Sequence, residues 1–425
     1  MTGTSPRGGL TALFAGRAGR RVSAVCAALG AFAVVSSGLA PNAVAADVQS
    51  KQWYLDPMDV EGMWKVSTGK GVKVAVLDTG VNPDTSSLKG QVLQGEVPRA
   101  VSYNATEDYL GHGTSMAELI AGTGAGGGLQ GLAPGAKIVP YRVLTKGVTN
   151  STDKKKTPSI ADAIKAAADS DAQILSMSFG GDITNPDEEA AVKYAQSKGK
   201  LMFAGTGNDA ESKNFIGFPA AYPYVVGVAA ADETGTVGSF SEHGNYVDLA
   251  APGLNVPTWC DATFRAYCSD GEGTSMATAI ASASAALIWS AHPDWTANQV
   301  LRSLIDTAGR DWPKDEPSNY LGYGLVRPRK VLESSSINPG PANTDPLSYE
   351  NGTGIPGVSS PPSSSASASA ASQAPKDTSG DATSAAGSSS NSSDDKTQLY
   401  VILGAALVVV IGGGAFALAR KRRTP

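Results

Sequence analysis

The stretch from 270 to 289 constrains the fold of this chain more strongly than any other segment. It reads Asp-Gly-Glu-Gly-Thr-Ser-Met-Ala and continues to Trp289 as a run dominated by Ala, with Ser, Ile and Leu. Two glycines before a long apolar run are typical of a tight turn that leads into a buried helix, and Pro293 ends that helix. The small residues on all sides allow the helix to pack deep inside a core.

Ser275 stands at the beginning of this helix. Backbone N–H groups there lack intrahelical acceptors, and the helix dipole is positive at this end. One interpretation is a structural N-cap, because Ser and Thr are favoured at that position. The other is a reactive serine beside free N–H donors, and the rest of the chain favours this second interpretation.

Short apolar runs alternate with helical patterns through the middle of the chain. We expect a polar loop at 145–158, a helix capped by Ser159 that runs to Ala168, a second helix at 187–196, and strands at 72–77, 136–144, 173–178, 201–204 and 225–230. Continuous apolar strands separated by helices are typical of a parallel sheet that is covered on both faces. The sequence therefore predicts an α/β fold with a doubly wound, mostly parallel sheet and helices on both faces.

Two titratable side chains fall at the edges of these elements. Asp78 ends the first strand, at the edge where open α/β sheets form their ligand crevices; an Asx-turn that closes the strand is the alternative. His112 opens an apolar segment and has glycines on both sides, which leave its ring accessible; a structural role is the alternative. His243 and His292 lack such a glycine frame, and we expect both to be structural.

The first 45 residues have the order of a secretory signal. Basic residues up to Arg21 precede an apolar run at 22–39, and Ala43-Val44-Ala45 provides a small-x-small cleavage site. We expect residues 1–45 to be a signal peptide that is cleaved after Ala45. A retained N-terminal membrane anchor is the alternative.

Residues 399–419 are apolar and uncharged, and four basic residues follow them directly. At about 1.5 Å per residue this segment spans roughly 30 Å, the thickness of the hydrocarbon layer. The positive-inside rule places the tail at 420–425 in the cytoplasm and the preceding chain outside. We therefore expect a single-pass protein of the cell membrane; the sequence has no Leu-Pro-x-Thr-Gly motif, which argues against a sortase anchor.

Residues 337–398 consist mainly of Ser, Ala, Pro, Gly and Asp, with very few large apolar side chains. Such a segment cannot bury a core, so we expect a disordered linker that reaches roughly 40 to 50 Å as a flexible coil. The folded domain is then expected at 46–336. A net charge of -5 gives no indication of a nucleic-acid partner.

The chain has three cysteines, and Cys26 lies in the predicted signal peptide. Cys260 and Cys268 flank an aromatic-bearing loop shortly before Ser275. In an exported protein we expect this pair to form a disulfide that braces the loop. A metal site is disfavoured, because no histidine and no second cysteine pair accompany them.

Asp78, His112 and Ser275 follow one another in an order known for the triads of serine peptidases. The motifs around them resemble those of the subtilisin-like serine peptidases (subtilases), and the resemblance extends from about Trp53 to Leu332. It is carried by the segments 74–80, 111–114, 176–180, 207–208, 239–241, 251–253 and 273–277.

The resemblance implies a role for each residue. Ser275 is expected to attack the scissile carbonyl, His112 to act as base and then acid, and Asp78 to orient the imidazole. Asn208 is expected to bind the oxyanion together with the Ser275 N–H. The expected substrate-binding residues, which line the specificity pocket and pair with an extended peptide, are Ser178, Phe179, Gly180, Ala204, Gly205 and Thr206. Calcium sites are common in the family, but no ligands can be assigned here, and no other cofactor is expected.

Three positions depart from the usual family patterns. Ala279 stands where subtilases commonly have proline, and Glu118 where they commonly have a small glycine. The order of signal peptide, peptidase domain, linker, membrane helix and basic tail resembles the mycosins, the membrane-anchored subtilases of actinobacterial type VII secretion. Mycosins commonly carry a cysteine near the catalytic histidine, whereas this chain has Tyr109 there and no cysteine.

These features predict a membrane-anchored extracellular serine endopeptidase that processes a few exported proteins, in contact with a type VII secretion complex. Two alternatives remain open. The domain could act as a structural clamp on such a complex without proteolysis. It could also be a leader peptidase for a ribosomally made peptide.

Overall fold

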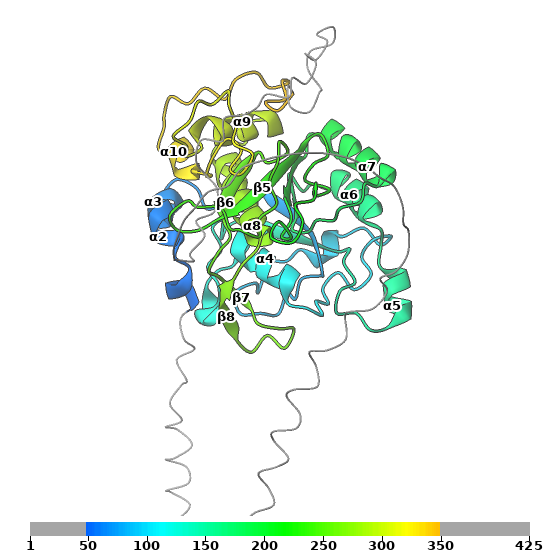
Figure 1. The fold of residues 1–425 in the computed structure, drawn as a ribbon. Coiled ribbons are helices and arrows are strands. Elements are labelled where there is room, and N and C mark those ends of the chain that lie inside the picture. The colour runs from blue at the N-terminus through cyan, green and yellow to red at the C-terminus, as the bar shows by residue number, and fades with distance from the viewer. Residues whose placement is uncertain (1–47, 349–425) are drawn as a thin grey trace, which may run out of the picture. The chain divides into compact units, whose positions relative to one another are not determined.

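The computed structural model describes residues 48–348 of the 425-residue chain (Figure 1). The predicted signal peptide, membrane helix and basic tail lie outside the described residues, as does most of the predicted linker. The described chain begins with a 3₁₀ helix at Val48–Lys51, followed by α2 at Leu55–Met58 and α3 at Val60–Trp64. Further 3₁₀ helices occupy Gln94–Glu96 and Ala125–Gly127.

A six-stranded parallel sheet forms the centre, in the order β2-β1-β3-β4-β5-β6. Every residue of these strands is buried except the lysines that begin β1 and β2, so the apolar runs of the sequence are strands covered on both faces. The bounds are β1 Lys73–Asp78, β2 Lys137–Arg142, β3 Ile174–Met177, β4 Leu201–Gly205, β5 Val225–Ala231 and β6 Leu249–Pro252.

Helices cover both faces of the sheet, as the alternation of side chains along β1 shows. Val74 and Val76 belong to the core shared with α4, α8, α9 and α10, whereas Ala75 and Leu77 belong to the core under α6 and α7. The predicted doubly wound fold is therefore confirmed. The bounds are α4 His112–Ala121, α6 Ile160–Ala168, α7 Pro186–Ser197, α8 Thr274–Ala291, α9 Ala297–Thr307 and α10 Pro328–Leu332.

Helix α8 is the buried helix expected from the 270–289 stretch. Its residues from Met276 to Trp289 are all buried, and it packs against β3, β4, β5 and β6. Within residues 48–348 it is the helix that is long and apolar enough to cross a membrane. Because it is enclosed by the rest of the domain, it is a core helix of the folded domain.

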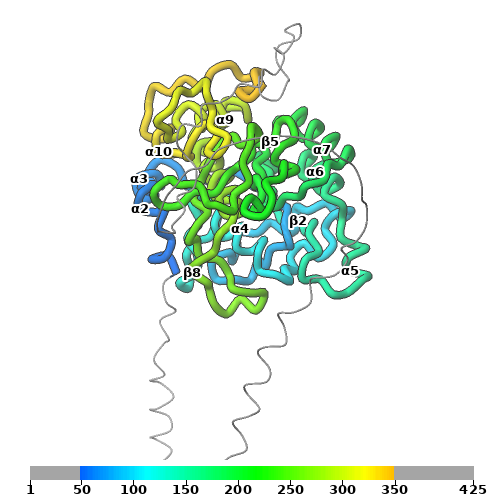
Figure 2. Tube along the Cα trace, viewed as in Figure 1, coloured from blue at the N-terminus to red at the C-terminus, as the bar shows by residue number. Residues whose placement is uncertain are grey.

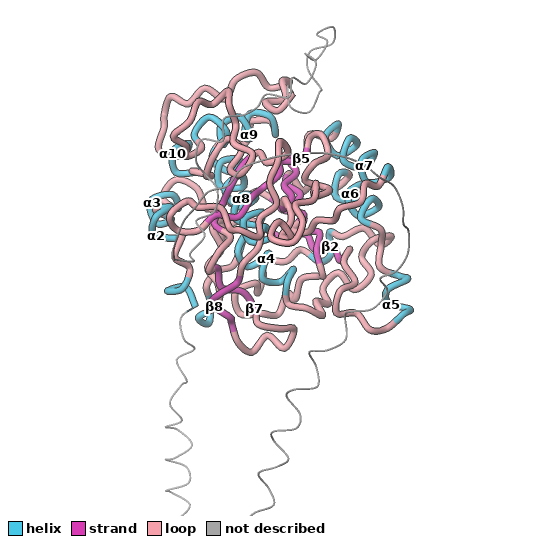
Figure 3. Tube along the Cα trace, viewed as in Figure 1, coloured by secondary structure: helices cyan, strands magenta, loops and turns pink. Residues whose placement is uncertain are grey.

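A hairpin that the sequence did not predict precedes α8. Its strands, β7 at Val256–Trp259 and β8 at Tyr267–Gly271, pair antiparallel and lie apart from the main sheet (Figure 3). The expected disulfide between Cys260 and Cys268 joins its two sides. The backbone N–H of Trp259 donates to Ser115 Oγ at 2.9 Å, so the hairpin is attached to α4.

The segment 145–158, expected as a polar loop, contains the helix α5 at Ser151–Lys156. Asn150 caps it by accepting hydrogen bonds from the backbone N–H groups of Thr152 and Asp153. The three lysines lie in its last turn, where positive charge complements the helix dipole. The lysine run, interpreted as a solvated loop, is therefore a short capped helix.

The folded chain continues beyond residue 336, where composition had placed the domain boundary. Side chains of α9 bind carbonyl oxygens of this segment: Gln299 Nε2 donates to Gly340 O, and Arg302 Nη2 to Thr344 O, both at 2.9 Å. Leu347 is buried in the main core. Figure 2 shows the preceding helix α10 beside α3, so both ends of the described chain pack on the same part of the domain.

Glu118, which stands at the position of the usual glycine, is fully buried in α4. Its carboxylate accepts hydrogen bonds from Thr85 Oγ1 at 2.6 Å and from the Tyr267 hydroxyl of the hairpin at 2.8 Å. Burial raises the pKa of Glu118 to about 7, although these hydrogen bonds oppose the shift. Glu118, the residue that departs from the family pattern, thus connects α4 to the hairpin through its bond to Tyr267.

We predict that Glu118→Gln stabilises the protein relative to wild type as the pH rises. Between the ordinary pKa of 4.5 and about 7 the folded state binds more protons than the unfolded state, so wild-type stability falls with increasing pH in this window. The variant should gain up to about 3 kcal/mol relative to wild type between pH 5 and pH 8, measured by urea unfolding. The exposed Glu316→Gln is the control, and an equal difference at both pH values would contradict the prediction.

Candidate active site

The carboxyl ends of β1 and β3 bring Asp78 and Ser275 to the same edge of the sheet. The register pairs Leu77 with Met177, so Asp78 and Ser178 follow on neighbouring strands. Ser178 Oγ donates to the Ser275 carbonyl at 3.1 Å, and Ser275 Oγ donates to the Ser178 carbonyl at 3.0 Å. The start of α8 is thereby attached to the strand end beside Asp78.

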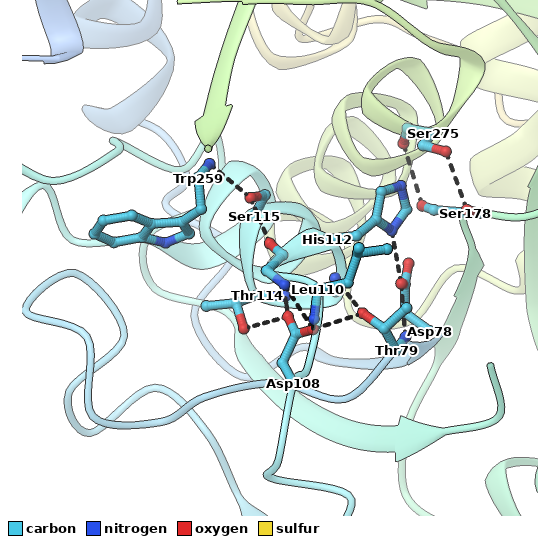
Figure 4. Close-up of polar contacts among 12 residues, drawn as sticks. Asp78, Thr79, Asp108, Leu110, His112, Thr114, Ser115, Ser178, Trp259 and Ser275 are labelled. Atoms are coloured by element: carbon cyan, nitrogen blue, oxygen red, sulfur yellow. Dashed lines mark hydrogen bonds and ion pairs between the residues drawn. The ribbon is translucent and has the colours of Figure 1, made fainter. Parts of the chain in front are cut away.

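His112 lies between these two residues at the start of α4 (Figure 4). Its Nδ1 is 2.7 Å from Asp78 Oδ1, and the carboxylate is fully buried whereas 29% of the imidazole is exposed. The second ring nitrogen lies on the side of Ser275 in Figure 4. The three residues expected to form the triad are therefore brought together from β1, α4 and α8.

Two close backbone approaches make this arrangement possible. A Cβ on Gly113 would collide with the carbonyl oxygen of Gly80, so α4 can begin against the end of β1 only with glycine there. A Cβ on Gly205 would lie 2.6 Å from Thr274 Oγ1, so the end of β4 requires glycine beside the start of α8.

Asn208 is oriented by the first residue of α8. Its Oδ1 accepts hydrogen bonds from the Thr274 N–H at 2.9 Å and from Thr274 Oγ1 at 3.1 Å. Its amide oxygen is therefore occupied, and Nδ2 is left as a donor in the pocket that Ser275 also lines. Ser275 belongs to the first turn of α8, where backbone N–H groups have no intrahelical acceptor. The two donors can together stabilise an oxyanion that forms beside Ser275 Oγ.

Two opposing effects act on the pKa of His112. Burial lowers it, whereas the charge of Asp78 and the hydrogen bond to it raise it, and the net result lies above the ordinary 6.5. Near neutral pH the ring can therefore both accept a proton and give it back, as general acid–base catalysis requires.

A second buried carboxylate, which the sequence did not single out, organises the start of α4. Asp108 Oδ1 accepts hydrogen bonds from Thr79 Oγ1 and from the N–H groups of Leu110 and Gly111, at 2.8 to 3.0 Å. Its Oδ2 accepts from the N–H and hydroxyl of Thr114, at 2.9 and 2.7 Å. Asp108 thus binds backbone on both sides of His112 and also the residue after Asp78.

A pocket of about 250 Å³ opens beside Ser275. It is lined by Phe179, Gly180, Gly181, Asp182, Gly207, Asn208, Asp209, Phe215, Glu242, Thr274 and Ser275. Of the residues expected to bind substrate, Phe179 and Gly180 line the pocket, whereas Ser178 is buried and is not part of the lining.

Ala204, Gly205 and Thr206 are buried and are not among the residues that line this pocket, because β4 continues through Gly205 inside the sheet and Thr206 follows it directly. Their expected role in substrate binding stays a prediction. Asp182, Phe215 and Glu242 were missed because no motif includes them. The only available signal was that Glu242 directly follows the 239–241 motif.

No group of three or more His, Cys, Asp or Glu residues within 48–348 is arranged to hold a metal ion. Calcium ligands can also be carbonyl oxygens, so the calcium site stays a prediction without assigned residues.

The site contains the functional groups that a serine hydrolase uses: a buried carboxylate, an imidazole, and a serine hydroxyl beside two N–H donors. The Subtilase family profile matches residues 69–324, more than half of the chain, and the chain therefore belongs to the subtilase family, whose members are serine endopeptidases. Minor extracellular protease Epr of Bacillus subtilis (strain 168) is 33% identical over 286 residues, which cover 65% of this chain and 41% of Epr. Subtilisin BL of Lederbergia lenta is 34% identical over 262 residues, which cover 61% of this chain and 90% of that protein.

Solved structures of similar proteins include proteases of type VII secretion. MycP3 protease from the ESX-3 system is 28% identical with a TM-score of 0.55, over 70% of this chain and 90% of that one. MycP1 from Mycobacterium smegmatis is 26% identical with a TM-score of 0.55, over 72% of this chain and 89% of that one. The chain is thus a subtilisin-like serine protease related to the mycosins.

We predict that kcat/KM for peptide hydrolysis rises with pH through a midpoint above 6.5, because free His112 must lose its proton to act as base. Asp78→Asn removes the charge that raises this pKa, so the midpoint should shift to lower pH and the rate should fall by about 10⁴-fold. A pH–rate profile measures both effects, with the exposed Asp84→Asn as the control. A midpoint at or below 6.5 in wild type would contradict the prediction.

We also predict that Asp108→Asn lowers kcat by about 10- to 100-fold and changes KM by less than about threefold. An amide has only one acceptor oxygen, so the backbone N–H groups of Gly111 and Thr114, which donate to different oxygens of Asp108, cannot both keep their acceptor, and the start of α4 shifts. Steady-state kinetics measure the effect, and the neighbouring exposed Glu107→Gln serves as the control. An unchanged kcat would exclude a positioning role for Asp108.

Proposed function

We propose that this protein is a membrane-anchored extracellular serine endopeptidase, with Asp78, His112 and Ser275 as its catalytic residues. The observation that carries the proposal is the 2.7 Å contact between Asp78 and His112 at the start of α4, beside a Ser275 that is attached to the next strand end. A buried carboxylate that holds an imidazole next to a serine hydroxyl is the arrangement that activates serine as a nucleophile.

The reaction proceeds by acyl transfer. Ser275 Oγ turns from the Ser178 carbonyl toward the imidazole, gives its proton to His112 Nε2, and attacks the scissile carbonyl carbon. Asn208 Nδ2 and the Ser275 N–H bind the resulting oxyanion. His112 then protonates the leaving amine as the C–N bond breaks, and a water molecule activated by His112 hydrolyses the acyl-enzyme. Asp78 stabilises the imidazolium in both steps and remains ionised throughout.

The location and context of this activity rest on the sequence and on the relatives. The apolar segment 399–419 and the basic tail at 420–425 support a single-pass anchor with a cytoplasmic C-terminus. Solved relatives are described as proteases of type VII secretion systems, which supports limited processing of exported proteins in such a system.

Protease digestion of intact cells should remove the folded domain and leave an epitope on the C-terminal tail protected.

A structural role in a secretion complex is the second candidate. It is favoured by the description of a related MycP1 as an essential component of a type VII secretion system. Deletion of the gene and the Ser275→Ala variant separate the two roles. Secretion that survives the substitution and fails on deletion assigns the structural role, whereas failure in both cases assigns proteolysis.

We predict that Ser275→Ala lowers kcat by at least about 10⁴-fold, because the variant lacks the hydroxyl proposed as the nucleophile. Peptide hydrolysis and labelling with a fluorophosphonate reagent measure the loss, and an unchanged melting temperature shows that the fold persists. Ser290→Ala, at the far end of the same helix, is the matched control. Undiminished hydrolysis by the Ser275→Ala variant would end the assignment.

A further inference from the structure

A buried carboxylate lines the pocket beside Ser275. Glu242 is 3% exposed and lines this pocket. Its Oε2 occupies the space next to the Cα of Gly207, because a Cβ added there would collide with it, and a Cβ on Gly217 would lie 3.3 Å from the same oxygen. The Glu242 carboxylate therefore lies against Gly207, the residue that precedes Asn208.

Two further acidic residues, Asp182 and Asp209, line the same pocket and are exposed at its surface. Burial, followed by the charges of Asp209 and Asp182, raises the pKa of Glu242 to about 7, while the backbone N–H groups of Phe215 and Asp209 oppose the shift. None of the three carboxylates takes part in an ion pair within residues 48–348. Lys213 lies nearby, but its ammonium stacks on the Phe215 ring at 4.6 Å.

The walls of the pocket combine bare backbone with two aromatic rings. Gly180 and Gly181 contribute backbone only, and the space around Gly181 is open. Hydrogen bonds between Gly181 and Phe218, at 2.9 and 2.8 Å, hold this wall in place. The rings of Phe179 and Phe215 add apolar surface. An aliphatic stem can lie between these walls while a cationic head reaches Glu242, as amphipathic side chains do elsewhere.

We propose that this pocket binds the Lys or Arg side chain on the acyl side of the scissile bond, and that Glu242 determines this specificity. The proposal rests on the endopeptidase function proposed above and adds a substrate class to it. A metal cation is not the occupant that the pocket fits, because the carboxylates within 48–348 do not gather into a group of three that could hold one. A basic side chain needs a counter-charge for its head and apolar surface for its stem, and Glu242 and the rings of Phe179 and Phe215 provide these here.

The test uses the full-length protein in detergent and peptides that differ only at the residue before the cleaved bond: Lys, Arg, Leu, Phe, Ala or Glu. In wild type, kcat/KM for Lys and Arg should exceed that for Leu by at least about 30-fold, and Glu242→Gln should remove most of this ratio. Glu211→Gln, which removes a nearby charge outside the pocket, is the matched control. A wild-type preference for Leu, Phe or Ala, or a ratio unchanged in Glu242→Gln, would overturn the proposal.

Fluorophosphonate labelling of Ser275 separates this proposal from the proposed function, because the reagent does not depend on the peptide side chain. Labelling of wild type without any preference for Lys or Arg overturns only the specificity, whereas absence of labelling overturns both. Labelling of Glu242→Gln shows that the variant is folded.

Two measurements do not depend on the variant. Benzamidine, an aromatic cation, should slow the labelling of wild type, and failure to compete would count against an acidic pocket.

The ratio of kcat/KM for Lys to that for Leu should fall as the pH drops below about 7, because Glu242 is then neutral. Asp182, Asp209 and Tyr246 face Glu242, and protonation of His112 affects both substrates alike. A ratio that stays constant between pH 5 and pH 8 would also contradict the proposal.

Discussion

The hydrogen bond between Asp78 and His112 is the interaction on which the site depends. Hydrogen bonds offset the cost of burying a carboxylate, and here Asp78 Oδ1 accepts from the Thr79 N–H at 2.7 Å and meets His112 Nδ1 at the same distance, whereas Oδ2 has no hydrogen-bond partner among residues 48–348. The imidazole is thereby held in one orientation, with its other nitrogen on the side of Ser275. The same contact raises the pKa of the ring against the effect of burial, so one interaction sets both geometry and basicity.

The rest of the domain keeps the partners of this bond in place. Parallel strands deliver Asp78 and Ser178 to one edge, and reciprocal hydrogen bonds between Ser178 and Ser275 attach the start of α8 to that edge. Asp108 binds the backbone around His112, and the hairpin before α8 is attached to α4 through Ser115 and Glu118. The segments that carry His112 and Ser275 are therefore connected by buried polar bonds as well as by packing.

The departures from the common family pattern have different consequences. Glu118 has a visible one, since its buried carboxylate joins Thr85, Tyr267 and α4. Tyr109 faces the buried Arg142 at 5.5 Å, an ordinary cation–π distance. Ala279 is buried within α8, which continues through it without a break; nothing in the structure explains the absence of proline there. None of these changes alters the bond between Asp78 and His112 or the bonds between Ser178 and Ser275.

The sequence by itself predicted most strands of the main sheet, several of its helices and the candidate triad residues. Apolar runs predict buried strands, Gly-Thr-Ser before a small-residue helix predicts the place of Ser275, and two cysteines eight residues apart predict their disulfide. These features are local, because periodicity and turn chemistry act over a few residues. Only the tertiary structure decided that the Glu242 carboxylate lies against Gly207, that Asp108 bonds to both sides of His112, and that residues 204–206 are buried. Each of these depends on which distant segments come into contact, and the burial and charge of a side chain follow from those contacts.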